Sequence, residues 1–252
     1  MKVRSSRSAA LSGTALLLAL SAVGCTQAFG NAPVHASNDT TPGAAPTATA
    51  APPDQAGGYP PGIGPSTARR IPPDTRQILL VTGTGQDSSA STAVLYQRTA
   101  SGEWQAQGSW AARNALHGWT TDHHEGDLYS PEGVFTLTDA GGLLPDPGSK
   151  LPYHQSYRFI DPGTGFEGEP LAGVFDYVIA INYNRVPGTS PLDEHRPDGE
   201  SHGGGIWLHL DHGGPSHGCV TLPRSAMVEL MRTLNLAQHP VIVMGVKEVL
   251  EK

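Results

Sequence analysis

Short apolar runs separated by turn residues limit the fold of this chain more than any other feature. Segments rich in Val, Ile, Leu, Thr, Tyr and Trp alternate with Gly, Pro, Asn, Asp and Ser, and long helical periodicity is scarce. β-Branched and aromatic side chains favour strands because they pack well on a pleated surface. The predicted strands cover residues 76–82, 91–98, 104–110, 132–137, 176–183, 205–210 and 241–244. The sequence therefore predicts a mostly β domain.

Trp104 and Trp110 bracket one predicted strand and are separated by an even number of residues. Side chains alternate between the two faces of a strand, so both rings are expected on the same face if one strand holds them. Aromatic rings such as these can stack on sugars, but packing in the core is the simpler interpretation.

One helix is predicted, with Pro223 at its first position and Asn235 at its end. Apolar side chains repeat at the spacing of a single helix face, at Met227, Leu230, Met231 and Leu234. We expect this stripe to pack in the core.

The N-terminus has the pattern of a secretory signal peptide over residues 1–24. Three basic residues precede an apolar run, Ala9 to Leu20, that is too short to span a bilayer. The small residue before Cys25 resembles a bacterial lipobox, so Cys25 is a candidate for lipidation; plain cleavage near Ala28 is the alternative. We expect an exported protein of the cell envelope, with a lipid anchor at the outer face of the cytoplasmic membrane.

Residues 25–71 are rich in Pro, Ala, Thr, Gly and Ser and are predicted to form a disordered tether, because they carry little that can form a core. Residues 72–246 are then one folded domain, and 247–252 a C-terminal tail. The formal net charge is −7 and no cluster of Lys and Arg occurs, which argues against a nucleic-acid partner.

Cys219 is the second of two cysteines and is alone once Cys25 is assigned to the export segment. A lone Cys is commonly an inert core residue, but here Ser216-His217-Gly218-Cys219 follows a strand that carries His209. A nearby imidazole favours the thiolate by accepting its proton. Gly218 permits a tight turn that exposes the sulfur. Because a helix follows at Pro223, we also expect Cys219 near a helix N-terminus.

The Ser-His-Gly-Cys tetrad after a strand-borne His resembles the signature of the YkuD-type L,D-transpeptidase family. Residues 126–135 resemble the family's Pro-x-Gly-x-Phe strand entry. The turn at Tyr183 and residues 236–245 resemble an actinobacterial-type branch, and the similarity covers about residues 76–246. It implies a β-sandwich catalytic domain with one amphipathic helix after the Cys. The implied reaction joins a peptidoglycan tetrapeptide stem to the Cys as a thioester, and the amine of a second stem then resolves it to a 3→3 crosslink. No cofactor is expected, and carbapenems are implied as inhibitors.

Carried over to this sequence, the resemblance implies Cys219 as the nucleophile and His209 as its base. Ser216 and Gly218 would shape the turn, and the N–H groups of Gly218 and Cys219 would form the oxyanion hole. The peptide carbonyl of His217 would orient the His209 ring, the role that an Asp has in other triads. Tyr183 is a candidate for substrate binding.

Two departures from the family pattern affect this assignment. Only six residues separate His209 from Ser216, and His202 lies at a spacing closer to the usual one, so His202 is the alternative base. His209 is favoured because it lies on an apolar strand, which would fix its ring. The family often has an Arg two positions after the Cys, where this chain has Thr221.

Three other functions stay open. Water in place of the amine would give an L,D-carboxypeptidase through the same thioester. A transpeptidase-like fold can also bind the cell wall without chemistry. His209 with His212, or His123 and His124 with Asp127, would suit zinc in a peptidase. No His-Glu-x-x-His helix supports the zinc alternative, so no metal is expected.

Overall fold

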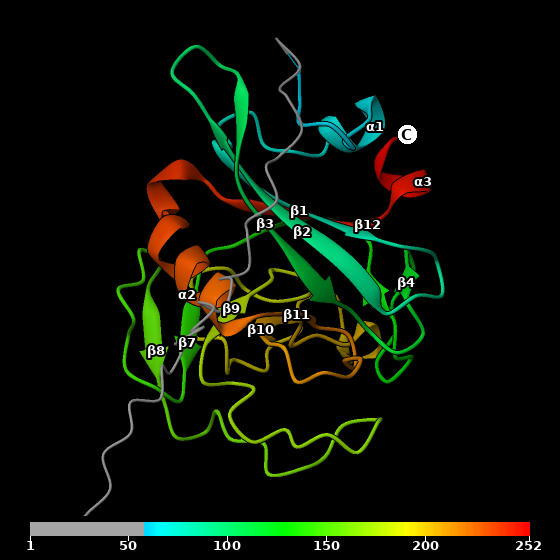
Figure 1. Cartoon of the computed structure of the whole chain (residues 1–252), viewed down its shortest axis with the longest axis vertical. Coiled ribbons are helices and arrows are strands. Elements are labelled where there is room, and N and C mark those ends of the chain that lie inside the picture. The colour runs from blue at the N-terminus through cyan, green and yellow to red at the C-terminus, as the bar shows by residue number, and fades with distance from the viewer. Residues whose placement is uncertain (1–57) are drawn as a thin grey trace, which may run out of the picture. The chain divides into compact units, whose positions relative to one another are not determined.

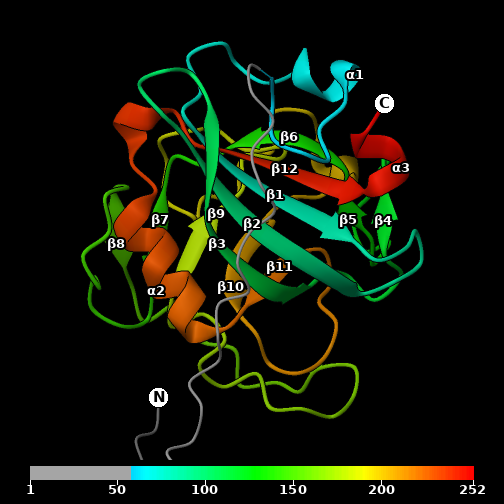
Figure 2. The same ribbon diagram turned by 45° about the horizontal axis from the view of Figure 1, so that its top comes forward.

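The computed structural model describes residues 58–252 (Figures 1 and 2). The predicted signal peptide, the lipidation candidate Cys25 and most of the predicted tether lie outside the described residues. Within the described range, every helix is too short or too polar to cross a membrane.

The domain contains many strands and few helices. The long strands are β1 (Gln77–Gly83), β2 (Ala90–Arg98), β3 (Trp104–Arg113) and β12 (Val241–Val246). The shorter ones are β4 (Trp119–Thr120), β5 (Ser130–Pro131), β6 (Gly133–Thr136), β7 (Ala140–Gly142), β8 (Tyr153–Gln155), β9 (Val178–Ala180), β10 (Trp207–Leu210) and β11 (Val220–Leu222). The helices are α1 (Pro65–Ala68), α2 (Arg224–Thr233) and α3 (Lys247–Leu250), with 3₁₀ turns η1 (Glu200–His202) and η2 (Leu236–Gln238).

One large mixed sheet organises these strands, in the order β6-β12-β1-β2-β3-β11-β10-β9-β7-β8, and β4 pairs with β5 separately. The pairs β1–β2 and β2–β3 are antiparallel hairpins, whereas β12 runs parallel to β1 and β11 runs parallel to β10. A large mixed sheet with few helices confirms the prediction of a mostly β domain.

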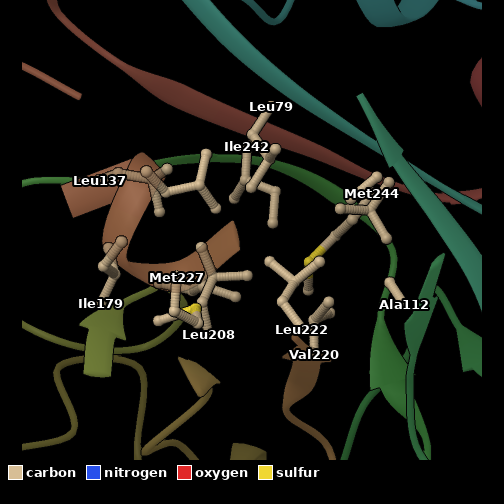
Figure 3. Packing of buried hydrophobic residues seen from close by; sticks show 14 of the residues in the cluster. Leu79, Ala112, Leu137, Ile179, Leu208, Val220, Leu222, Met227, Ile242 and Met244 are labelled. Carbon is tan, nitrogen blue, oxygen red and sulfur yellow. The ribbon is translucent and has the colours of Figure 1, made fainter. Parts of the chain in front are cut away.

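Two apolar clusters lie on opposite faces of the sheet centre. Leu79 and Ile242 point into the main core, where they meet side chains from β10, β11 and α2 (Figure 3). Their neighbours Ile78 and Val241 point into a second cluster on the other face. Strands β1 and β12 are therefore buried on both faces, which explains their unbroken apolar sequences.

Helix α2 packs against β10 and buries the predicted apolar stripe (Figure 2). Met227, Leu230, Met231 and Leu234 are fully buried, which confirms their place in the core. The prediction that Cys219 lies near this helix N-terminus is wrong, because β11 lies between Cys219 and Arg224. Five residues of extended chain span about 16 Å, so the helix dipole is remote from the sulfur.

The ordered domain is longer at both ends than the sequence indicates. Ile71, assigned to the tether, is buried in the second cluster together with Leu250 from the assigned tail. The Gly64 N–H donates to the carbonyl of Leu250 at 2.8 Å, and the Ser66 N–H to that of Lys252 at 2.6 Å. These contacts join the two terminal segments of the domain.

A β-bulge overturns the expectation for the two tryptophans of β3. Leu95 pairs with Gly108 and Tyr96 with Ala106, so Gln107 is an extra residue on β3. An extra residue inverts the alternation of side chains beyond it. Trp104 consequently lies in the second cluster, whereas Trp110 packs against the main core.

Candidate active site

The parallel strands β10 and β11 present one apolar face and one polar face. Leu208 is aligned with Val220 and Leu210 with Leu222, and these four side chains belong to the main core. Because side chains alternate along a strand, His209 and the residue before β11, Cys219, point to the opposite face. They lie on neighbouring strands, offset diagonally by two residues.

A pocket of about 140 Å³ lies over this polar face and is lined by both Cys219 and His209. The half-buried Cys219 accepts a hydrogen bond from the Trp207 N–H at an N···S distance of 3.4 Å. Its thiol donates to the carbonyl of Gly205 at 3.7 Å. Within the part of the chain that the structure describes, no hydrogen bond joins the sulfur to the His209 ring, and such contacts commonly form only when substrate binds.

The His209 ring is buried, and its orientation is fixed by the backbone. Its Nδ1 lies 3.0 Å from the carbonyl oxygen of Leu210. This contact favours a proton on Nδ1 and leaves Nε2 as the acceptor, the tautomer that a base for Cys219 requires. The edge of Phe175 packs against the ring at a centroid distance of 5.0 Å. The predicted orienting carbonyl, that of His217, is wrong: Leu210 supplies it, because the adjoining carbonyl of the same strand is within reach.

Burial favours the neutral forms of both Cys219 and His209. Burial raises the pKa of the Cys219 thiol to about 11, against the opposing effect of the Trp207 N–H. Burial, with a smaller contribution from the adjacent His212, lowers the pKa of His209 to about 4. These shifts favour a thiol and a neutral imidazole in the resting pair.

The loop hairpin 163–171 borders the pocket. Gly165 lines the pocket and pairs with Glu169, and the Glu169 carboxylate contacts Nδ1 of His212 at 2.9 Å. The exposed His217 ring lies 4.6 Å from the ring of Phe166, at the tip of the hairpin. The side chain of His217 is thus a wall of the pocket.

Close packing favours glycine at position 218. A Cβ there would lie 2.8 Å from Cδ1 of Ile206 and 3.4 Å from the carbonyl oxygen of Tyr129. Gly218 is not among the residues with positive φ, so close approach and not an unusual backbone angle favours it. The Ser216 hydroxyl closes the turn by donating to the carbonyl of Cys219 at 2.5 Å.

His202 and Tyr183 lie in a different pocket, of about 310 Å³, together with His123 and Asp198. The Tyr183 hydroxyl donates to the carbonyl of His202 at 2.9 Å, and the carbonyl of His123 lies 3.2 Å from the same oxygen. Of the predicted residues, the structure thus brings Cys219, His209, Ser216 and His217 to one pocket and leaves His202 and Tyr183 out of it.

Thr221, where the family often has an Arg, is buried and donates to Asp211 at 3.2 Å. Arg113 stands opposite Thr221 in register on β3, and its Nε lies 3.3 Å from the same carboxylate. A neighbouring strand therefore supplies a cation beside this position.

The histidines considered as zinc ligands have other partners. Nδ1 of His209 faces a carbonyl, Nδ1 of His212 faces Glu169, and His123 contacts Asp127 at 2.9 Å. Across residues 58–252, no group of three or more His, Cys, Asp or Glu side chains is arranged to hold a metal ion.

Three contacts to the site escaped the sequence analysis: the N–H of Trp207, the carbonyl of Leu210 and the hydroxyl of Ser130. The first two are backbone groups, which leave no signal in side-chain identity. Ser130 donates to the carbonyl of Gly218 at 2.8 Å. It lies in the 126–135 segment that resembles the family, but nothing in that segment separates this hydroxyl from an ordinary turn serine.

No protein-family model matches the chain, and no curated protein matches it. Among solved structures, the helical cell shape determining protein Pgp2 from Campylobacter jejuni is similar to it, with a TM-score of 0.34 and 18% identity. The match covers 68% of this chain and 48% of that one, so the similarity spans about half the length of that structure.

Proposed function

We propose that this protein is a cysteine-dependent L,D-transpeptidase of peptidoglycan on a YkuD-like β-sandwich. One observation carries the proposal: Cys219 and His209 face a common pocket from adjacent parallel strands, and the Leu210 carbonyl holds the His209 ring in the tautomer of a base. A buried imidazole held in this way beside a lone thiol is the arrangement that nucleophilic cysteine chemistry needs.

The reaction begins from the neutral pair. As the sulfur of Cys219 attacks the carbonyl of the third stem residue, Nε2 of His209 takes the thiol proton. The bond to D-alanine breaks, the leaving amine takes that proton from His209, and a thioester with Cys219 remains. The amine of a second stem then attacks the thioester and gives a proton to His209, and the expelled sulfur recovers it as the thiol.

The same thioester yields to water in an L,D-carboxypeptidase, and only the acceptor differs. A cell-wall-binding module without chemistry is the remaining alternative, for which an ordered Cys–His pair would have no use. We further propose an envelope location with a lipid on Cys25, no nucleic-acid partner and no cofactor. Acylation of Cys219 by carbapenems follows from the same chemistry.

Intact-mass spectrometry of the purified protein tests the proposal. Incubation with a disaccharide tetrapeptide should give a Cys219 adduct and free D-alanine, and Cys219→Ala should give neither. The mass of the product separates a crosslinked dimer from a hydrolysed tripeptide. Folded protein that forms no adduct with the stem or with a carbapenem would support the binding module instead.

A further inference from the structure

We infer that Ser130 is a positioning residue that aims the Cys219 N–H into the oxyanion hole. The inference rests on the proposed function for its biological substrate, but its geometry concerns any acyl group that reacts at Cys219. Ser130 lies on β5, far from Cys219 in sequence, and is fully buried.

The hydrogen bonds of the Ser130 hydroxyl have a fixed direction. Its oxygen accepts a hydrogen bond from the Ala115 N–H at 3.1 Å, a group that can only donate. The hydroxyl proton is then directed to the carbonyl of Gly218, 2.8 Å away, which can only accept. The hydroxyl therefore accepts from Ala115 and donates to Gly218, and these two roles cannot be reversed.

The bond to Gly218 sets the direction of the next N–H. The Gly218 carbonyl and the Cys219 N–H belong to the same peptide group, which is planar and trans, so the two point in opposite directions. A carbonyl held toward buried Ser130 therefore turns the Cys219 N–H away from that buried side. Cys219 itself lines the pocket.

The remaining contacts of the turn agree with this direction. The Ser216 hydroxyl holds the carbonyl of Cys219, so both carbonyls next to the nucleophile are engaged by serines. In the described chain, outside the strand ladders, no acceptor is hydrogen-bonded to the N–H of Gly218 or of Cys219. Donors held ready for the developing oxyanion are what such a hole requires.

Ser130 is itself held by the β4–β5 pair, which is linked to β12. It is aligned with Trp119 on β4, and its N–H donates to the Gly118 carbonyl at 2.9 Å. Two residues on, the Glu132 carboxylate accepts a hydrogen bond from the Val246 N–H at the end of β12. Hydrogen bonds and chain connections therefore link β12 to the peptide group before Cys219.

Two reactions of the same sulfur test the role. Acylation by p-nitrophenyl acetate passes through an oxyanion, whereas alkylation by iodoacetamide displaces iodide at a saturated carbon and forms none. Ser130→Ala should lower the acylation rate constant about 10- to 100-fold, less than the roughly 10²- to 10³-fold cost of removing an oxyanion donor, because the Cys219 N–H remains and loses only its fixed direction. Alkylation at the same pH should stay within about twofold, because the sulfur and His209 are unchanged.

Two further variants complete the test. Ser130→Thr keeps the hydroxyl and should restore acylation. Ser149→Ala removes a comparable hydroxyl-to-carbonyl bond, to Leu151 at 2.9 Å, away from the turn and should change neither reaction.

An equal loss of both reactions in Ser130→Ala would show a collapsed turn and overturn the inference, as would unchanged acylation. The activated ester does not depend on recognition of a stem peptide. If wild-type protein reacts with the ester but never with the stem, the proposed function fails while the Ser130 result still stands or falls separately.

Discussion

The centre of the sheet and the part that holds the candidate site share the same strand geometry but bury different side chains. Strands β1 and β12 bury apolar side chains on both faces. Strands β10 and β11 do so on one face only, and on the other they hold His209 and Cys219. Both are parallel pairs, so the difference lies in the side chains and not in the backbone.

The comparison shows how the site obtains rigidity. Leu208 and Leu210 fix β10 in the main core, and the alternation of the strand then fixes His209 on the other face. The His209 ring has no need of a carboxylate to orient it, because the strand that packs it also supplies the Leu210 carbonyl. Neighbouring residues of one strand therefore have separate roles: Leu208 and Leu210 pack in the core, and His209 lines the pocket.

Two substitutions at neighbouring positions of β10 should separate a loss of chemistry from a loss of stability most clearly. His209→Ala should lower acyl transfer about 10²- to 10⁴-fold, the usual contribution of a general base. Leu208→Ala should instead destabilise the fold by about 2–5 kcal/mol and leave the rate per folded molecule nearly unchanged. Thioester formation and urea unfolding measure the two effects.

His202→Ala is the control for the base, since His202 lies in the other pocket and should leave acyl transfer unchanged. Loss of activity in His202→Ala with activity retained in His209→Ala would move the base to His202.

The pH dependence of two reactions tests the protonation states of His209 and Cys219. A His209 pKa lowered to about 4 keeps the ring able to accept a proton at all higher pH, so acylation should fall only as the pH drops through that value. A Cys219 pKa raised to about 11 means that alkylation by iodoacetamide should rise about tenfold per pH unit toward that value. Stopped-flow profiles of both reactions test this, and an alkylation plateau already reached below neutral pH would instead indicate a resting thiolate–imidazolium pair.

Substitution of Gly218, which packs against Ile206, should have a smaller effect on stability and acylation. Gly218→Ala brings a Cβ to 2.8 Å from Cδ1 of Ile206, a side chain that can shift, so a cost of about 1–3 kcal/mol and a moderate loss of acylation are expected. Ile206→Val removes that methyl and should recover part of both losses in the double variant. Gly85→Ala, whose nearest neighbour is 3.8 Å away, is the matched control. Thermal unfolding and acylation rates report the outcome, and a double variant no better than Gly218→Ala would exclude the clash.

Sequence periodicity predicted the strands whose apolar residues repeat over several positions. The runs at 76–82 and 241–244 became β1 and β12, because central strands need apolar side chains on both faces. The eight residues at 176–183 became the three of β9, because turn contacts hold Asp176 and Tyr183 outside the ladder. The Gly-rich β7 carries no alternation, so its pairing is decided by neighbours distant in sequence.

The candidate site likewise has features that the sequence predicted and features that it did not. The tetrad and the strand-borne His209 were visible because side-chain identity carries their chemistry. The resting protonation state was not, because it depends on burial that only the folded chain creates. The bulge at Gln107, which inverts the alternation of side chains on β3, was not visible in the sequence either. One unpaired residue leaves the composition of a strand unchanged.

The position of β12 has a consequence for the order of folding. This strand comes last in the chain but lies between β6 and β1, near the middle of the sheet. The second strand of the central pair is thus synthesised about 160 residues after the first, and contacts of such sequence separation make folding slow. During synthesis, β1 exposes an apolar edge until residues 241–246 emerge. A chain stopped before that point would lack the partner that covers this edge, and its hazard would be aggregation before any loss of catalysis.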